Sequence, residues 1–343
     1  MTRLRNLCER LSTTFWFLPS WMTLAAVGLS FGAIAVDNRV QSKLFGESGY
    51  WWLYTGGAEG ARTLLSTVAG SMITVVGIAF SMTIVSLQLA SSQFGPRLLR
   101  NFMRDTGNQV VLGTFVATFM YCLLVLRTVR GKDGIVDAFV PNVAVTVGVL
   151  LAACSVAVLI YFIHHIAAMI QADNVVAAVS AELDATIERL FPEPVGRPAP
   201  TAPSADLPDD FDEQAAPVPA PRTGYLQTVN LDDLMALARE HDLVLRLAHH
   251  PGMFMLAGTP VAFAWPRARL DEQVARAAAK AFTIGAQRTP SQDVEFGIWQ
   301  LVEIAVRALS PGINDPHTAI ACVDRLGAAL AKIGRRPPPE SRR

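Results

Sequence analysis

One uncharged stretch decides the class of this chain. Residues 63–96 read TLLSTVAGSMITVVGIAFSMTIVSLQLASSQFGP and contain no Asp, Glu, Lys or Arg. A helix rises ~1.5 Å per residue, so this stretch would measure about 50 Å, whereas the hydrocarbon core of a bilayer is ~30 Å thick. The sequence therefore predicts a membrane helix that tilts or projects into water.

Small and weakly polar residues recur on one face of this predicted helix. In lipid, such residues lie against other helices or against water. Their spacings of three, four and seven place them together, and the set is Ser66, Gly70, Thr74, Gly77, Ser81 and Gln88. Two interpretations follow: tight packing between helices, or a polar pathway lined by several copies of this helix. A basic cluster comes next, Arg97, Arg100 and Arg104, where it could favour anions at an inner mouth.

Three further apolar segments complete a predicted transmembrane domain of four helices over residues 1–163. They cover residues 16–36, 110–126 and 141–163, and a spanning helix needs ~20 residues. A cleaved signal peptide is the alternative for the first segment, because basic residues precede it and small residues end it. An even number of spans places both termini on one side. Lys and Arg divide almost evenly between the two sides, so the positive-inside rule does not choose the side.

Composition and charge narrow the classes of function. Hydrophobic residues make up 51% of the chain and charged residues 17%, and the formal net charge is zero. Without a positive field we expect the lipid bilayer as partner and no nucleic acid. The cysteines, at positions 8, 122, 154 and 322, are too scattered for a disulfide framework or a zinc site. We therefore expect reduced thiols, cytoplasmic termini and location in the inner (plasma) membrane.

The second half of the chain predicts a smaller soluble domain. Residues 164–191 predict an amphipathic connector helix in which residues 169, 176, 183 and 190 are apolar, and a coiled coil there is the minority interpretation. Residues 192–222 are rich in proline, alanine and acid, which is typical of a disordered linker. Residues 223–343 predict an α+β domain that is mainly helical, with strands at 224–229 and 243–247 and helices at 231–241, 270–284, 292–309 and 315–333.

The last of these helices has the clearest pattern. Asp315 is a natural cap and Pro316 suits the first helical position. One apolar stripe is predicted from the residues Ala319, Cys322, Val323, Leu326, Leu330 and Ile333. Residues 307–318 then form a tight turn between this helix and the preceding one.

A polar constellation around this turn is the candidate ligand site. Its members are Arg288, Asp293, Arg307, Ser310, Asn314, Asp315 and His317. Arginine beside a helix N-terminus can bind an anion such as phosphate. The structural alternative is that Asp315 only caps its helix, while Arg307 pairs with Glu303 and Arg288 pairs with Asp293. None of the strong catalytic motifs occurs, so we expect no enzyme activity, no cofactor and no metal site.

Three long motifs give the chain a resemblance to a known family. They are SSQFGPRLLRNFMRD at residues 91–105, RTPSQD at 288–293 and RALSPGINDPHTA at 307–319. With them the chain resembles the bacterial DUF2254 family of predicted membrane proteins. The resemblance implies a multi-pass membrane protein, and it brings neither an activity nor a catalytic residue.

Three hypotheses of function follow. The leading one is an oligomeric channel or transport-type protein, a homo-oligomer in which residues 63–96 line or gate a polar pathway. The second is a membrane-anchored sensor or scaffold whose cytosolic domain binds a ligand or partner at residues 307–318. An enzyme comes third, because no nucleophile–base pair or metal set can be named.

Overall fold

The computed structural model describes residues 16–40, 53–96, 105–131, 139–192 and 207–337. The chain divides into two compact units, Met1–Gln171 and Ala172–Arg343. Each unit is described by itself.

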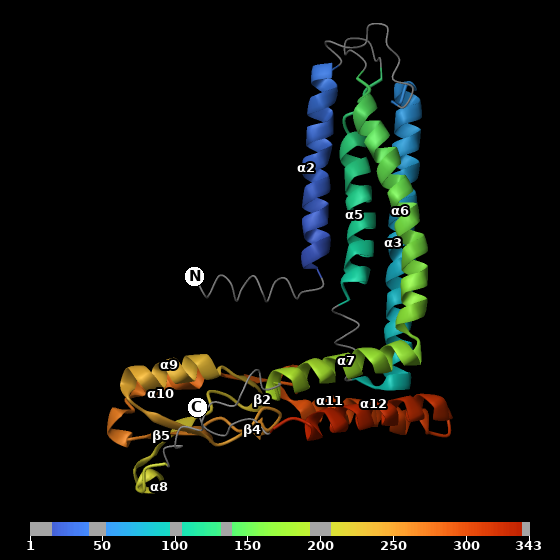
Figure 1. Cartoon of the computed structure of the whole chain (residues 1–343). Coiled ribbons are helices and arrows are strands. Elements are labelled where there is room, and N and C mark those ends of the chain that lie inside the picture. The colour runs from blue at the N-terminus through green and yellow to red at the C-terminus, as the bar shows by residue number, and fades with distance from the viewer. Residues whose placement is uncertain (1–15, 41–52, 97–104, 132–138, 193–206, 338–343) are drawn as a thin grey trace. The chain divides into compact units, whose positions relative to one another are not determined.

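The first unit contains four described helices that are long and apolar enough to cross a membrane (Figure 1). They are α2 (Phe17–Val40), α3 (Ala58–Phe94), α5 (Thr106–Leu126) and α6 (Asn142–Met169). The central helix is α5, which packs against the other three. Half of its apolar stretch is buried (50%), against 22%, 17% and 22% in α2, α3 and α6. The four predicted spans are thus present as helices.

A buried acid joins two of these helices. Asp37, near the C-terminal end of α2, is 4% exposed. Its two carboxylate oxygens accept hydrogen bonds from the backbone N–H groups of Val143 and Ala144, both at 2.9 Å. The first N–H groups of a helix lack an acceptor within that helix, and Pro141 gives α6 no side-chain cap. Asp37 therefore caps α6 from a different helix.

The second unit begins with a layer of three helices. The first, α7 (Ala172–Leu190), packs on both α11 (Val294–Ala308) and α12 (Pro316–Gly334). The predicted connector is therefore divided, because α6 continues to Met169 and α7 belongs to the C-terminal unit. Val176 and Leu183, two of the residues spaced by seven, are 2% and 1% exposed. That repeat packs within its own chain.

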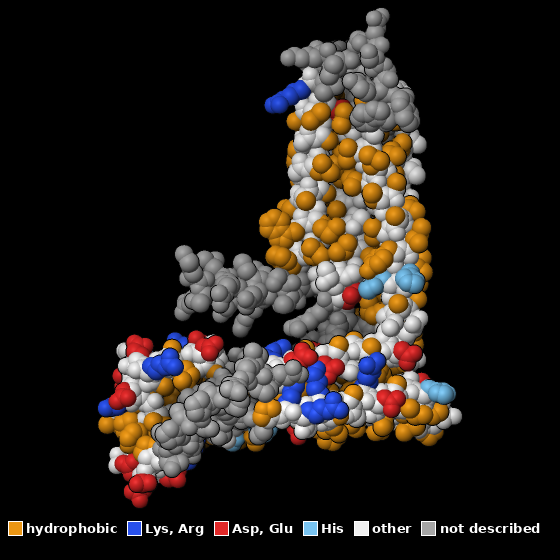
Figure 2. Space-filling model, viewed as in Figure 1, with side chains coloured by type: hydrophobic (Ala, Val, Ile, Leu, Met, Phe, Trp, Pro, Cys, Tyr) orange, Lys and Arg blue, Asp and Glu red, His pale blue; other side chains and the backbone are white. Residues whose placement is uncertain are grey.

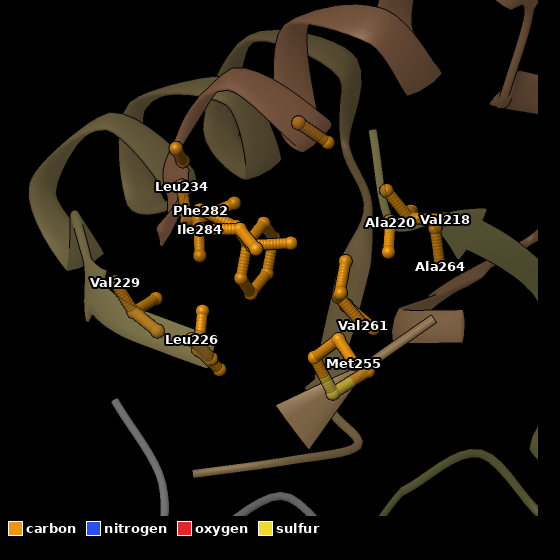
Figure 3. Packing of buried hydrophobic residues seen from close by; sticks show 13 residues of the cluster. Val218, Ala220, Leu226, Val229, Leu234, Met255, Val261, Ala264, Phe282 and Ile284 are labelled. Atoms are coloured by element: carbon orange, nitrogen blue, oxygen red, sulfur yellow. The ribbon is translucent and has the colours of Figure 1, made fainter. Parts of the chain in front are cut away.

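Two small antiparallel sheets complete this unit. One has the strand order β1 (Ala216–Pro219), β5 (Pro260–Trp265), β3 (Val244–Leu247). The other has the order β4 (Phe254–Met255), β2 (Gly224–Val229), β6 (Phe282–Gly285). Residues of both sheets form one buried cluster with Leu234 of α9 (Leu231–His241) and Ala278 of α10 (Glu272–Lys280) (Figure 3). The short elements are α8 (Phe211–Gln214), η2 (Arg267–Arg269) and η3 (Pro290–Gln292).

Several predicted elements of this unit are confirmed. Strand β2 has the predicted bounds, and β3 begins one residue later than predicted. Asn230 caps α9 by accepting a hydrogen bond from the N–H group of Asp233 at 3.3 Å. Asp315 likewise caps α12, with Pro316 as its first residue.

Two predictions for this unit are wrong. Part of the expected disordered linker, 192–222, forms α8 and β1, and Phe211 and Val218 are 2% and 0% exposed. Strand β1 is an edge strand, and its two prolines are exposed while Ala216 and Val218 are buried. Proline is tolerated at a sheet edge, so a proline-rich composition does not exclude a strand. Residues 282–285 form β6 instead of a helix end, because Phe282 and Ile284 alternate into the core.

Candidate functional site

The small polar face of α3 is exposed in the subunit. All six predicted residues of this face, Ser66, Gly70, Thr74, Gly77, Ser81 and Gln88, are exposed. The opposite side of the helix is buried, at Ala61, Leu65, Ala69, Met72, Ala79, Ala90 and Phe94. The helix therefore packs on the described part of its own bundle with one side only.

The glycines on this face do not serve packing among the described residues. A Cβ built on Gly70 or on Gly77 would meet no atom within 4 Å. By contrast, a Cβ on Gly148 of α6 would lie 3.1 Å from a methyl group of Leu65. Within the described part of the subunit, tight packing is thus not the role of Gly70 and Gly77. Packing between copies and a polar pathway remain as interpretations.

The hydroxyl groups on this side of α3 donate to their own helix. Ser66 donates to the carbonyl oxygen of Thr63 at 3.0 Å, and Thr74 donates to that of Gly70 at 3.1 Å. Ser71 donates in the same way to Thr67 at 2.7 Å. These bonds satisfy the donors without an external partner. The hydroxyl oxygens keep both lone pairs, so the face offers weak acceptors.

Helix α3 has the excess length that the sequence predicted. Its 37 residues correspond to about 55 Å, well beyond the ~30 Å of a hydrocarbon core. It ends at Gly95, whose φ of 110° is accessible to glycine and whose N–H group donates to the carbonyl oxygen of Ser91. The basic cluster of Arg97, Arg100 and Arg104 lies outside the described residues.

In the second unit, Arg288 forms an ion pair with the buried carboxylate of Asp293. The guanidinium donates from Nε to Oδ2 of Asp293 at 2.8 Å and from Nη2 to Oδ1 at 2.9 Å. It also donates to Glu295 at 3.0 Å. Asp293 is 4% exposed and caps α11 by accepting from the N–H group of Phe296 at 3.0 Å. The hydrogen bond with Asp293 is the main cause that raises the pKa of Arg288.

The rest of the RTPSQD motif connects this ion pair to the fold. The Gln292 side chain accepts from the N–H group of Val229 at 2.8 Å and donates to its carbonyl oxygen at 3.1 Å. The carbonyl oxygen of Pro290 accepts from the hydroxyl group of Thr186 on α7 at 2.8 Å. The motif therefore ties α7, β2 and α11 together, and the predicted structural alternative describes its arginine correctly.

The turn between α11 and α12 also follows the structural alternative. Arg307 donates to Glu303 at 3.4 Å. Asp315 accepts from the N–H group of Thr318 at 3.2 Å and from its hydroxyl group, and these two bonds lower the pKa of Asp315. Asn314 has a left-handed φ of 49°, and the carbonyl oxygen of Ser310 accepts its N–H group at 2.8 Å. The side chains of Asn314 and His317 are exposed.

The structure does not bring the predicted constellation together. Arg288 and Asp293 lie before the N-terminal end of α11. The other members lie at the C-terminal end of this helix or beyond it, and they are Arg307, Ser310, Asn314, Asp315 and His317. The 15 residues of this helix correspond to about 22 Å. Two separate clusters replace the single anion site that was expected. No group of three or more His, Cys, Asp or Glu side chains placed to hold a metal occurs in the described ranges.

Sequence reasoning also missed a contact between His165 and Asp105. Nε2 of His165, near the end of α6, lies 2.7 Å from Oδ2 of Asp105, which caps α5. The ring of Tyr161 stacks on His165 with 5.3 Å between the centroids. The only available indication was a capping aspartate at the start of one apolar segment and a histidine at the end of the next. The sequence pattern does not show that these two ends meet.

Comparisons with known proteins identify relatives and a family for this chain. An uncharacterised protein of Mycobacterium tuberculosis and one of Mycobacterium bovis are each 38% identical to it over 347 residues. That similarity covers 99% of this chain and 64% of the relatives, so the chain spans somewhat less than two thirds of their length. No solved structure matches the chain. The family model described as "Predicted membrane protein (DUF2254)" matches residues 12–343, and the chain therefore belongs to the DUF2254 family of predicted membrane proteins.

Proposed function

We propose that the chain is a subunit of an oligomeric membrane channel or transport-type protein, in which α3 from several copies lines or gates a polar pathway. One observation supports the proposal most directly. The small polar face of α3 is exposed and lies opposite the side that packs on the bundle. A helix that served only as an anchor would need no such face.

The sides of this face suit contact between copies. Successive residues turn by about 100° around a helix. On that spacing Ile73 and Phe80 flank the face on one side, and Ile78 and Val85 flank it on the other. All four are at least half exposed, at 51%, 50%, 58% and 54%. Neighbouring copies that met through these apolar flanks would turn the stripe of Ser, Thr and Gly toward a common axis.

The location belongs to the same proposal. We place the protein in the plasma membrane with both termini in the cytoplasm, and the C-terminal unit there as a soluble domain that regulates or assembles the pathway. The argument is the reduced state expected for the scattered cysteines, of which Cys322 is 0% exposed in the C-terminal unit.

Flux through the full-length protein in liposomes tests the proposal. We expect ions to pass under a voltage or a concentration gradient, and we expect Thr74→Leu or Ser81→Leu to reduce that flux because a larger apolar side chain narrows and dries the pathway. The matched control is Ile78→Leu, an apolar exchange on the flank of the same helix. Absence of flux under voltage, gradient and membrane tension would refute the proposal.

A second measurement separates a pathway from simple packing between copies. Chemical cross-linking gives the number of copies in the membrane for each variant. A pathway requires that Thr74→Leu lowers flux while the assembly stays intact. If every leucine variant that lowers flux also dissociates the assembly, the face serves packing and the pathway is rejected.

A further inference from the structure

The second unit leaves a large apolar surface uncovered on α11 and α12. Trp299 and Val306 on α11 and Leu309, the residue that caps its C-terminal end, are 52%, 65% and 60% exposed. Three side chains on α12, those of Ile320, Val323 and Leu330, are 58%, 62% and 59% exposed. We call these six residues the hairpin face.

The residues of the hairpin face follow the repeat of paired helices. On α11 and its C-cap the apolar positions are 299, 302, 306 and 309. On α12, positions 316, 320, 323, 327 and 330 carry only Pro, Ile, Val, Gly and Leu. Spacings that alternate between three and four average 3.5 residues, which keeps one stripe directed at a neighbouring helix. α11 is therefore apolar on two opposite sides, since Phe296, Leu301 and Ile304 are buried on the other.

Both stripes lie on the side of the hairpin that faces away from α7. On α11, Gly297 lies against α7, because a Cβ built on it would be 3.0 Å from Leu183. On α12, Lys332 pairs with Glu188 of α7 at 2.7 Å. Successive residues turn by about 100° around a helix, so the stripe on α11 lies roughly opposite Gly297 and the stripe on α12 roughly opposite Lys332. The two stripes thus form one continuous face of the hairpin, and hydrophobic side chains gather along this edge of the unit in Figure 2.

The size of the hairpin face corresponds to an interface. Six large apolar side chains, each more than half exposed, present on the order of 600 Å². The largest apolar patch on a typical monomer is about 300–600 Å², and a standard interface buries about 800 Å² on each partner. The hairpin face with its rim therefore supplies most of one side of a stable dimer.

We propose that the hairpin face binds the same face of a second copy, so that two α11–α12 hairpins form a four-helix bundle around a two-fold axis. A two-fold interface uses one patch twice and requires that the patch fits itself. In an antiparallel pair of α12 helices centred on residue 325, Val323 of each copy meets Gly327 of the other. Each Val323 side chain then fills the space above a glycine, and Ile320 of each copy meets Leu330 of the other.

The charges around the hairpin face favour a second copy over a lipid surface. Helices that lie on a membrane carry Lys and Arg beside their apolar face. Here the exposed acid Asp324 borders the stripe on α12, whereas the exposed Glu295 continues the stripe on α11 and pairs with Arg288 at 3.0 Å. The proposal concerns assembly of the C-terminal unit and does not depend on conduction through α3.

Cross-linking in membranes tests the pairing on the full chain. In a background with the cysteines at 8, 122, 154 and 322 replaced by alanine, Val323→Cys is treated with a short bis-maleimide. We expect a covalent dimer, because residue 323 lies beside the proposed two-fold axis. The matched control is Leu256→Cys, whose side chain is equally exposed at 57% but lies outside the hairpin face. A dimer yield for Val323→Cys no higher than that of Leu256→Cys would overturn the proposal.

A second substitution ties the cross-link to the hairpin face. Adding Val306→Glu should abolish at least nine tenths of the dimer, whereas adding Leu256→Glu should leave the yield unchanged. Both sites are exposed in the single subunit, so neither exchange should unfold it, and the melting temperature of the detergent-solubilised monomer checks this in parallel. A cross-link that survives Val306→Glu would overturn the proposal. So would quenching of a fluorophore at residue 323 by spin-labelled lipid, since lipid would then occupy the face.

Discussion

Replacing Arg288 by methionine tests whether the RTPSQD motif is a structural brace. Methionine retains much of the apolar stem but leaves the Asp293 carboxylate, whose side chain is 3% exposed, without its guanidinium partner. The matched control is Arg269→Met, because Arg269 forms an ion pair with Asp242 in which the side chains are 49% and 87% exposed.

The two variants should differ severalfold in stability. Removing one partner of a buried ion pair lowers the free energy of unfolding by about 3–5 kcal/mol, and we expect the lower end because Arg288 is 23% exposed. A surface pair contributes at most about 1 kcal/mol. With a denaturant slope of about 2 kcal/mol per molar urea, Arg288→Met should lower the urea midpoint by ~1.5 M and Arg269→Met by no more than ~0.5 M.

Labelling of Cys322 by a maleimide dye reports this unfolding in the full-length protein. The thiol group is 0% exposed in α12, and burial raises its pKa to about 11, so the folded thiol is protonated and shielded near neutral pH. In a variant that retains only this cysteine, the labelled fraction is measured against urea concentration. Equal midpoint shifts for Arg288→Met and Arg269→Met would refute the interpretation that the RTPSQD motif stabilises the fold through Arg288.

One further substitution in each unit, with its control, tests the stability of the fold. Gly252 has a φ of 100°, and a Cβ built on it would overlap the carboxylate of Asp293, whereas Gly258 has a φ of 86° and no neighbour within 4 Å. Alanine at Gly258 therefore adds only backbone strain, which costs about 1–2 kcal/mol. Gly252→Ala should lower the urea midpoint at least twice as much as Gly258→Ala. Asp37→Asn replaces one of two acceptors by a donor, which should remove about 1 kcal/mol of capping free energy and so lower the melting temperature in detergent. Exposed Glu59→Gln should leave the melting temperature unchanged. Equal melting temperatures for the two variants would contradict the cap.

Elements that depend on neighbouring residues could be predicted from the sequence. The 63–96 stretch lies within a described helix up to Phe94, and Asn230 and Asp315 cap the helices that they precede. Each of these results depends on residues a few positions apart. Periodicity and capping chemistry contain that information without any knowledge of the tertiary structure.

Contacts between distant segments could not be predicted in this way. Asp37 was one acid among several near a helix end, and its use as a cap for α6 depends on a residue 106 positions away. The apolar residues of α12 were predicted as one stripe, but Ala319 and Cys322 are buried whereas Val323 and Leu330 are exposed. In the sequence, two adjoining apolar faces give nearly the same pattern as one wide face. Only the packing of α7 and α11 on α12 shows which apolar residues are buried and which are exposed.

The two exposed surfaces are informative for opposite physical reasons. In lipid, an exposed Ile78 needs no explanation, because acyl chains are as apolar as the side chain; the exposed stripe of Ser, Thr and Gly on α3 is the unusual feature there. In water, an exposed serine needs no explanation, whereas an uncovered apolar surface is unfavourable by about 25 cal/mol per Å². For the C-terminal unit, which we propose to be soluble, the hairpin face is therefore the unusual feature. Each surface departs from what its own solvent favours, and contact with further copies of the chain would resolve both departures.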